Sequence, residues 1–582
     1  MPHTATLRGL TRNWTFRSAA CADPDLPLTT RILAARGLVD GAEIDSFLNP
    51  SLKTLHDPSL IPDLDKAAAR LLEALKANQR IAIYGDYDVD GITATTILYK
   101  TFKLLRPDAD LVTYIPHRID EGYGLNTQAI EQLAADGVNV IVTVDCGVTA
   151  IEQALVAKRL GVDLIITDHH NPPETRDDLP PAFAIVHPRH PDSNYPYGEL
   201  CGAGVAYKLA WRLGTLAAGS DRVGEAMQKL LIDLLAMVAL GIIADVVPLT
   251  GENRVLARFG LARIKHSPIV GLKALVNASG LAGDNIAEED VGFRLGPRLN
   301  ACGRMGHARD AVELFLTENA RRASQIADDL TRLNDRRRVE EQQIVKKAIE
   351  LAEERGMTAP DRRVIVLAHP DWHPGIVGIA CSRLAGRFVR PVILMQECGD
   401  VCKGSGRSVD GYSLYAGLEA CSDFIEKFGG HDMAAGLTIK TTQLDAFTQA
   451  LTNHANSHID PEDLVRSVEI DVDASISEMT PAAICELTKL APFGRENPRI
   501  KVRLRDVRIV GRPEPLGRGG QHLALRIGDS TRALRCVAWN WGEHIERIGA
   551  GAAIEAVVCP KISRWGGRIS VEPELIDLRV ID

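Results

Sequence analysis

The chain has 582 residues, of which 45% are hydrophobic and 25% charged, and its net charge is −9. This length is too great for one hydrophobic core and predicts two to four domains of an ordinary globular kind. A membrane span needs about 18 consecutive apolar residues, and the longest candidate, residues 230–249, is interrupted by Asp233 and Asp245, so we expect no membrane span.

The cysteines and the N-terminus indicate a compartment. The eleven cysteines are scattered and form no CxxC pair, and residues 1–14 contain no continuous apolar segment. An odd, scattered set of thiols is typical of a reducing environment, and a secretory signal needs an apolar centre. We therefore expect a cytoplasmic protein.

Residues 1–60 read as an ordered N-terminal extension without recognisable chemistry. From about residue 80, short apolar runs at 81–85, 111–116, 138–145 and 163–170 alternate with helix-like segments. This alternation predicts a parallel sheet with helices on both faces. Ligand sites in such sheets lie beyond the carboxyl ends of the strands, so polar residues that follow the runs should gather at one edge.

Those runs end in acids and imidazoles: Asp86, Asp88 and Asp90, then Asp145, then residues 168–170, Asp-His-His. Like charges this close need a counter-charge. Oxygen and nitrogen ligands suit Mn²⁺ or Mg²⁺, and histidine favours Mn²⁺. Two such ions about 4 Å apart activate water and stabilise charge on a phosphoryl group. A polar turn with a capping aspartate explains any one of the first three acids but not the whole set.

Asp245 follows an apolar helical stretch, "ALGIIA". A buried carboxylate without a partner is costly. A capped helix end is one interpretation, and a metal ligand is the one we favour beside the other acids.

The rest of the chain divides by composition. Residues 317–356 are a charged helical pattern without proline, which predicts a connector helix. Residues 497–582 alternate in short runs with glycine-rich turns, which predicts a small β-barrel, and residues 495–582 hold 16 basic and 11 acidic side chains. The predicted order is an extension (1–60), an α/β catalytic domain (61–315), a connector helix (316–356), a smaller α/β domain (357–460), a linker (461–496) and the barrel (497–582).

Several blocks together resemble a known family. "GDYDVDG", "VDCGV", "DHH" and "ALGIIADVVPL" are similar to the DHH phosphoesterase superfamily. Further blocks continue in the same order and resemble the RecJ-like single-strand-specific exonucleases over roughly residues 60–500; they are "IPHRIDEGYGL", "CGAGVAYK", "GPRLNACGRM", "WHPGIVGIACSRL", "GSGRS" and "KFGGHDMAAGL". One tripeptide would be weak evidence, whereas ten ordered blocks are specific.

The resemblance implies roles for the acids and histidines. It gives six ligands to two Mn²⁺ or Mg²⁺ ions: Asp86, Asp88, Asp90, Asp145, His169 and Asp245. His170 faces the substrate phosphate or a metal, and together with Asp145 and His169 it belongs to the catalytic set. Asp168 orients a histidine from behind.

The resemblance also implies substrate contacts. Arg118, Ser405 and Arg407 match a pocket for a 5′-phosphate, and Gly429, Gly430 and His431 match the part that grips the nucleotide end. Arg298 and Arg304 belong to a block that contacts the strand. A guanidinium clamps a phosphate with two bonds, and the Gly-Ser-Gly sequence would let backbone N–H groups approach it.

The β-rich tail resembles the OB-fold domain of bacterial RecJ proteins. Trp539, Trp541 and Trp565 are candidate stacking platforms for single strands, with core packing as the alternative for each. The implied activity is a 5′→3′ exonuclease on single-stranded DNA that releases 5′-mononucleotides in DNA repair and recombination. The implied partners are single-stranded DNA, a single-strand-binding protein and a helicase, and the implied state is a monomer.

Two alternatives stay open. Another DHH activity, a nano-RNase or a cyclic-dinucleotide phosphodiesterase, belongs to chains that are generally shorter and lack this tail. A non-catalytic replication scaffold of the same family would have lost ligand positions, and here each of them is filled. Cleavage polarity, and DNA over RNA, rest on the resemblance alone.

Overall fold

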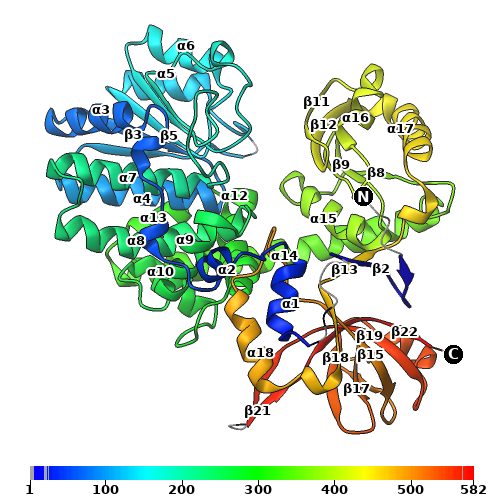
Figure 1. Ribbon diagram of the computed structural model, residues 1–582. Coiled ribbons are helices and arrows are strands. Elements are labelled where there is room, and N and C mark those ends of the chain that lie inside the picture. The colour runs from blue at the N-terminus through cyan, green and yellow to red at the C-terminus, as the bar shows by residue number, and fades with distance from the viewer. Residues whose placement is uncertain (1–5, 19–22, 24, 119, 566–567, 582) are drawn as a thin grey trace.

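The protein is described by a computed structural model that covers residues 6–18, 23, 25–118, 120–565 and 568–581. Helix α14 (Ala320–Glu354) runs between an N-terminal α/β domain and a second α/β domain, and a β-barrel lies below both (Figure 1).

The first domain contains a five-stranded parallel sheet, as predicted. Its strands in spatial order are β4 (Leu111–Tyr114), β3 (Ile81–Gly85), β5 (Val140–Val144), β6 (Asp163–Thr167) and β7 (Ala184–Val186). Alternate strand residues enter different cores, because neighbouring side chains point to opposite faces. One core contains α3 (Leu64–Lys76), α4 (Val89–Leu105) and α7 (Gly202–Ala218), and the other contains α5 (Thr127–Ala135) and α6 (Ile151–Arg159).

A helical layer completes this domain. It consists of α8 (Glu225–Ala244), α9 (Gly251–Ile264), α10 (Val270–Ala278), α11 (Glu288–Asp290), the π-helical turn η4 (Val291–Leu295), α12 (Gly296–Met305) and α13 (Arg309–Leu316). Helix α8 is long and apolar enough to cross a membrane, but 67% of its apolar window is buried and it packs against α4, α7 and α9. Asp233 on α8 accepts a hydrogen bond of 3.0 Å from Arg263. The apolar composition of α8 is therefore that of a core helix.

The second α/β domain has a mixed sheet in the order β11 (Lys427–His431), β12 (Ala434–Lys440), β10 (Val401–Arg407), β9 (Val392–Cys398) and β8 (Ile365–His369). Helix α15 (Pro374–Phe388) packs between one face and α14, and α16 (Leu414–Glu419) and α17 (Leu444–His458) cover the other face.

The C-terminal barrel is closed because β15 (Val502–Ile509) pairs with both β19 (Ala553–Cys559) and β17 (His522–Gly528). The remaining barrel strands and the attached hairpin are β14 (Val472–Ala474), β16 (Glu514–Leu516), β18 (Ala533–Ala538), β20 (Ile562–Trp565), β21 (Arg568–Val571) and β22 (Glu574–Val580).

The N-terminal extension is part of the barrel's surroundings. Strands β1 (Leu7–Arg8) and β2 (Asn13–Phe16) form a sheet with β13 (Ser467–Ile470), and α1 (Leu28–Ala35) packs into the barrel core, while α2 (Gly41–Leu48) contacts it at the edge. Asp577 of β22 accepts hydrogen bonds from Thr11 N, Thr11 Oγ1, Arg12 N and Trp14 Nε1, at 3.1, 3.0, 3.0 and 2.8 Å. Residues 461–496, where we expected a linker, carry β13, β14 and α18 (Pro481–Leu487).

Candidate active site

The aspartates after β3 sit where a strand turns into a helix. Asp88 is the N-cap of α4, and its Oδ1 accepts hydrogen bonds from the backbone N–H of Asp90 (2.8 Å) and Gly91 (3.1 Å). An N-cap aspartate satisfies N–H groups that the helix leaves unpaired. The capping interpretation is therefore correct for one oxygen of Asp88, and it does not account for Asp86 or Asp90.

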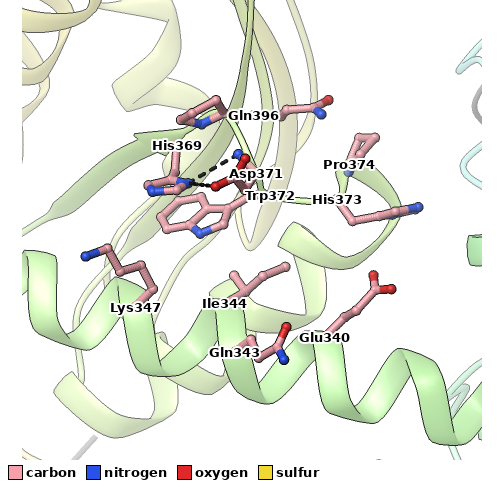
Figure 2. A pocket seen from close by; sticks show the side chains of 11 residues that line it. Glu340, Gln343, Ile344, Lys347, His369, Asp371, Trp372, His373, Pro374 and Gln396 are labelled. Carbon is pink, nitrogen blue, oxygen red and sulfur yellow. Dashed lines mark hydrogen bonds and ion pairs between the residues drawn. The ribbon is translucent and has the colours of Figure 1, made fainter.

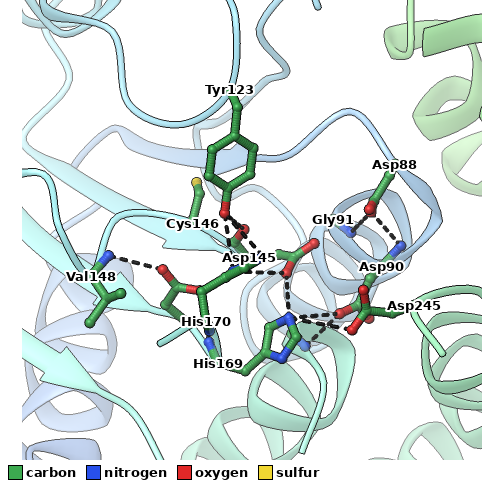
Figure 3. A network of polar contacts seen from close by, with 12 residues as sticks. Asp88, Asp90, Gly91, Tyr123, Asp145, Cys146, Val148, His169, His170 and Asp245 are labelled. Carbon is green, nitrogen blue, oxygen red and sulfur yellow. Dashed lines mark hydrogen bonds and ion pairs between the residues drawn. The ribbon is translucent and has the colours of Figure 1, made fainter. Parts of the chain in front are cut away.

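The other acids and histidines arrive at the same edge. Asp145 follows β5 with φ of +65°, residues 168–170 follow β6, and Asp245 ends α8. Three overlapping groups have ligand atoms within 4.8 Å of one another: Asp145, His169 and His170; Asp90, His169 and Asp245; and Asp86, Asp88 and Asp145. The fold thus unites all six predicted metal ligands with His170. Figure 3 shows five of these ligands beside His170: Asp88, Asp90, Asp145, His169 and Asp245.

Glycines make room for this cluster. A Cβ on Gly202, at the start of α7, would lie 2.7 Å from the Asp145 Cβ, and one on Gly241 of α8 would lie 2.3 Å from Asp90 Oδ1. The same helix start binds an acid directly, because Gly202 N and Ala203 N donate to Asp90 at 2.6 and 2.9 Å. Backbone N–H groups at a helix N-terminus favour a negative charge.

Three buried atoms at the centre of the cluster have no hydrogen-bond partner among the described residues: Asp86 Oδ1, Asp145 Oδ1 and His169 Nε2. His169 Nε2 lies 3.1 Å from Asp145 Oδ1, 3.5 Å from Asp245 Oδ2 and 3.8 Å from Asp90 Oδ2. Buried polar atoms are almost always paired, so these atoms mark a place that suits a positive partner. Their oxygen and nitrogen chemistry fits Mn²⁺ or Mg²⁺.

The pKa values of the acids report the same need for a cation. Burial, and then the charge of Asp88, raises the pKa of Asp90 to about 6. Burial followed by the charges of Asp90 and Asp88 raises the pKa of Asp245 to about 8. Burial is also the main cause of the pKa rises of Asp86 and Asp145, well above the usual range. A bound cation would favour the charged form of each.

The two histidines differ in charge because their environments differ. Burial, and then the charge of His170, lowers the pKa of His169 to about 3, so this imidazole is neutral and its Nε2 can act as a ligand. Burial opposes the protonation of His170, but its 2.8 Å hydrogen bond with Asp168 Oδ1 and the charge of Asp168 raise its pKa to about 9. His170 is therefore a cation when no metal is bound.

Asp168 is fully occupied by its neighbours. It accepts hydrogen bonds from His169 N, His170 N and Val148 N at 2.7, 3.1 and 2.9 Å, besides the one from the His170 ring. Burial opposes ionisation of Asp168, but these hydrogen bonds and the neighbouring imidazoles lower its pKa. The geometry is that of a residue that orients His170, as the resemblance implies.

Tyr123 is a site residue that the sequence did not single out. Its hydroxyl lies 3.0 Å from His170 Nδ1 and 3.3 Å from the carbonyl oxygen of Asp145, and its ring lies against His170 (Figure 3). It belongs to the "EGYGL" block, and that block was the available signal.

Arginines from three elements lie close enough to affect one another's charge. Arg118 lies after β4, Arg304 near the end of α12 and Arg407 at the end of β10. Burial, and then the positive charges of Arg118, Arg337 and Arg407, lowers the pKa of Arg304 to about 9. Burial also lowers the pKa of Arg407. Buried cations that repel one another make this group a candidate anion site.

The position of Ser405 supports this anion site, and its backbone requires a correction. A Cβ on Gly378 of α15 would lie 3.4 Å from Ser405 Oγ and 3.3 Å from Arg407 Nη2, so both side chains point at α15. We expected the backbone N–H groups of the Gly-Ser-Gly sequence to approach a phosphate, and this was wrong. Residues 404–406 lie in the middle of β10, which is paired with β9 and β12 on both sides. The glycines are needed because a Cβ on Gly404 would lie 2.2 Å from the Leu394 carbonyl oxygen.

Gly429, Gly430 and His431 lie on the edge strand β11. His431 and Arg407 are both register partners of Ala434, so they sit two strands apart, which is about 9–10 Å. Gly430 has φ of +142°, and a Cβ there would lie 2.3 Å from the Ala434 carbonyl oxygen. These residues share an end of the sheet with Arg407.

Arg298 is placed apart from the arginine trio. Its guanidinium donates to Thr331 Oγ1 at 3.2 Å and to the Arg294 carbonyl at 2.6 Å. It lines a groove between α12, α14 and α15 that also reaches Arg304.

The three tryptophans predicted as candidate stacking platforms belong to the barrel domain. Trp539 is 52% exposed beside His522, whereas Trp541 is buried in the barrel, and the side chain of Trp565 lies outside the described residues. A pocket of about 570 Å³ lies at the end of β8 against α14 and contains His369 and Trp372 (Figure 2). None of the predicted site residues lines it.

Comparison with known proteins places these features in one family. The chain matches the DHH family N-terminal domain over residues 80–242, the DHHA1 domain over 361–457 and the RecJ OB domain over 470–577.

Individual relatives match across most of the chain. It is 38% identical to the single-stranded-DNA-specific exonuclease RecJ of Bacillus subtilis (strain 168), covering 93% of this chain and 66% of that protein. It is 36% identical to the RecJ of Salmonella typhimurium, and this match covers 85% of this chain and 87% of that protein. The crystal structure of RecJ from Thermus thermophilus with Mn²⁺ matches with 32% identity and a TM-score of 0.78, and the match covers 95% of this chain and 76% of that one. The structure of the same protein with Mg²⁺ matches with 30% identity and a TM-score of 0.73, and the match covers 95% of this chain and 74% of that one.

Proposed function

The chain belongs to the RecJ family of DHH phosphoesterases, and on this premise we propose that it is a divalent-metal-dependent exonuclease acting on single-stranded DNA. It hydrolyses the strand from the 5′ end and releases 5′-mononucleotides, acting in DNA repair and recombination.

The observation that carries the proposal is the position of Arg118 between two clusters. Its charge acts on Asp86 in the acidic cluster, and on Arg304 and Arg407 in the anion site. Its guanidinium lies 4.8 Å above the Tyr87 ring, next to Asp86. A terminal phosphate bound by the arginines would thus have its strand directed at the acids. On its far side the phosphate would face α15 and β10, since Ser405 and Arg407 of β10 lie against Gly378 of α15.

The acidic cluster supplies the ligands for the metal ions. Asp86, Asp88, Asp90, Asp145, His169 and Asp245 would hold two Mn²⁺ or Mg²⁺ ions. When bound, such ions activate water and neutralise charge that develops on phosphorus.

The chain's own side chains then position the substrate. His170, held by Asp168 and Tyr123, presents a partly exposed imidazole to the scissile phosphate. Arg118, Arg304 and Arg407 bind the terminal phosphate, and a bound terminal phosphate holds the scissile linkage in a fixed orientation at the acidic cluster.

The test of the function uses 5′-labelled and 3′-labelled strands of about 20 nucleotides with Mn²⁺. The proposal expects the 5′ label to appear as a mononucleotide in the first products, while the 3′-labelled strand shortens step by step. A 3′ label released first would refute the polarity. Absence of cleavage in Mn²⁺ and in Mg²⁺ would refute the enzyme and favour the scaffold alternative. Faster hydrolysis of a cyclic dinucleotide or of RNA dinucleotides would favour the other DHH activities.

The cellular setting is proposed on separate grounds. The ten cysteines in the described part of the chain are free thiols, which supports a reducing, cytoplasmic location. We carry over a single-strand-binding protein and a helicase as partners, and a monomeric state, from the family resemblance.

A further inference from the structure

Phe293 is unusually exposed for an aromatic side chain. At 81% exposure it is the most exposed large hydrophobic residue in the described part of the chain. It lies in the middle of the π-helical turn η4, a rare element that often occurs at functional sites. An exposed aromatic ring of this kind offers a stacking face to a ligand.

A basic groove begins at this ring. It has a volume of about 1020 Å³, and Phe293 and Pro297 contribute to its wall together with Arg298 and Arg304 of α12. Seven basic side chains and two carboxylates line it. Arg298 donates its hydrogen bonds to neutral partners, a hydroxyl and a carbonyl, and the nearby charge that favours its cationic form is that of Asp335.

The groove adjoins both parts of the active site. At one end Arg304 belongs also to the anion site. At the other end η4 packs against α8, and a Cβ on Gly296 would lie 3.8 Å from the Ala244 methyl group, next to Asp245. Val246, which follows Asp245, is 58% exposed with φ of +59°, so it presents an apolar side chain beside the metal ligands.

We propose that the part of the strand 3′ of the scissile linkage leaves the acidic cluster over Val246 and stacks a base on Phe293, while its phosphates contact Arg298 in the groove. This inference rests on the proposed function and adds the path of the substrate. Positive charge along a groove tracks a phosphate backbone, and stacking on an aromatic ring tolerates any base. In this proposal the stacked base lies beyond the second nucleotide, so cleavage of a dinucleotide should not depend on Phe293.

The experiment compares substrate lengths with the full-length protein. The substrates are a 5′-phosphorylated dinucleotide and a 5′-phosphorylated thymidine strand of about 12 nucleotides, and the quantity is the ratio of their kcat/KM values in Mn²⁺. Phe293→Ala should lower the ratio of long to short about 10-fold, because one stacked base is lost. Phe293→Trp should restore it. Arg298→Ala should lower the same ratio. It should also reduce the slope of log binding constant against log salt concentration for the longer strand by about one, the value for one lost phosphate contact. This binding is measured by fluorescence anisotropy in EDTA.

Matched controls lie on α6, outside the groove. Leu155→Ala removes an apolar side chain from a residue that is 53% exposed, and Arg159→Ala removes a guanidinium whose side chain is 67% exposed. Both substitutions should leave the ratio of kcat/KM values unchanged. A ratio unchanged in Phe293→Ala, or an equal loss on both substrates, would overturn the inference. Failure of the proposed function is a different result, since the wild-type protein would then cleave neither substrate or only the dinucleotide.

Discussion

Arg407 gives a direct test of how the strand end is recognised, because it is buried and its contacts are few. Its guanidinium donates to the Gly406 carbonyl at 2.8 Å and faces Gly378 of α15. Burial and the positive charge of Arg118 both disfavour its cationic form. A terminal phosphate would relieve that cost, so we expect Arg407→Ala to weaken recognition of a 5′-phosphate selectively.

The magnitude follows from the type of contact. A hydrogen bond to a charged group contributes about 1.5–3 kcal/mol, and Arg304 and Arg118 remain in the mutant. With about 1.4 kcal/mol for each tenfold change, we expect kcat/KM for a 5′-phosphorylated strand of about 12 nucleotides to fall about 10- to 150-fold. The same strand with a 5′-hydroxyl should lose less than about 3-fold, because it lacks the dianionic group that Arg407 binds.

The assay measures steady-state kcat/KM for both strands in wild type, Arg407→Ala and the control Arg387→Ala. Arg387 is exposed on the same helix-and-sheet domain, where it stacks on Phe388. The control should lose nothing on either strand. If Arg407→Ala loses equally on the phosphorylated and the hydroxyl strand, Arg407 does not bind the terminal phosphate and the end-recognition argument fails.

Three further changes test other parts of the structure. Asp145→Ala should lower kcat more than about 1000-fold without unfolding the chain, since it removes a carboxylate shared by two of the ligand groups; a folded mutant that keeps a tenth of the activity would contradict this. Gly241→Ala should weaken Mn²⁺ activation about 10- to 100-fold, measured by metal titration, because the new methyl group displaces Asp90; unchanged activation would show that Asp90 is not held by this packing. Asp577→Ala should cost about 2–4 kcal/mol locally by leaving buried donors unpaired, seen as faster proteolytic cleavage near residues 7–16 with the rest of the chain resistant; equal resistance in mutant and wild type would count against it.

The acidic cluster was predictable from the sequence because its geometry follows from topology. Parallel strands of one sheet end at the same edge, so Asp86, Asp145 and His169 had to approach one another once the α/β alternation was recognised. Asp245 required more than periodicity, since it ends a helix of the second layer, and the family blocks supplied its place. The three-residue strand β7 was too short to give a pattern.

The anion site was only partly predictable. Arg118, Arg304 and Arg407 are separated by up to 289 positions, and no local pattern relates them. The "GSGRS" block looked like a phosphate-binding loop because glycine and serine are typical of such loops. In the fold the same glycines sit in a central strand, where they allow β10 to pack closely against Leu394 and Met395. Glycine serves both phosphate-binding loops and close strand packing, and only the tertiary structure shows that here it serves the packing.

The arginine that joins the two domains is also the one that faces the anion site. Arg304 of α12 donates a hydrogen bond of 3.2 Å to the carbonyl of Gly375, at the start of α15, and α12 also packs against α14. The repulsion among Arg304, Arg118 and Arg407 opposes this arrangement unless an anion lies between them. A terminal phosphate would convert three repelling charges from two domains into three attractive contacts. Recognition of the strand end and the alignment of the second domain on the acidic cluster would then have the same physical cause.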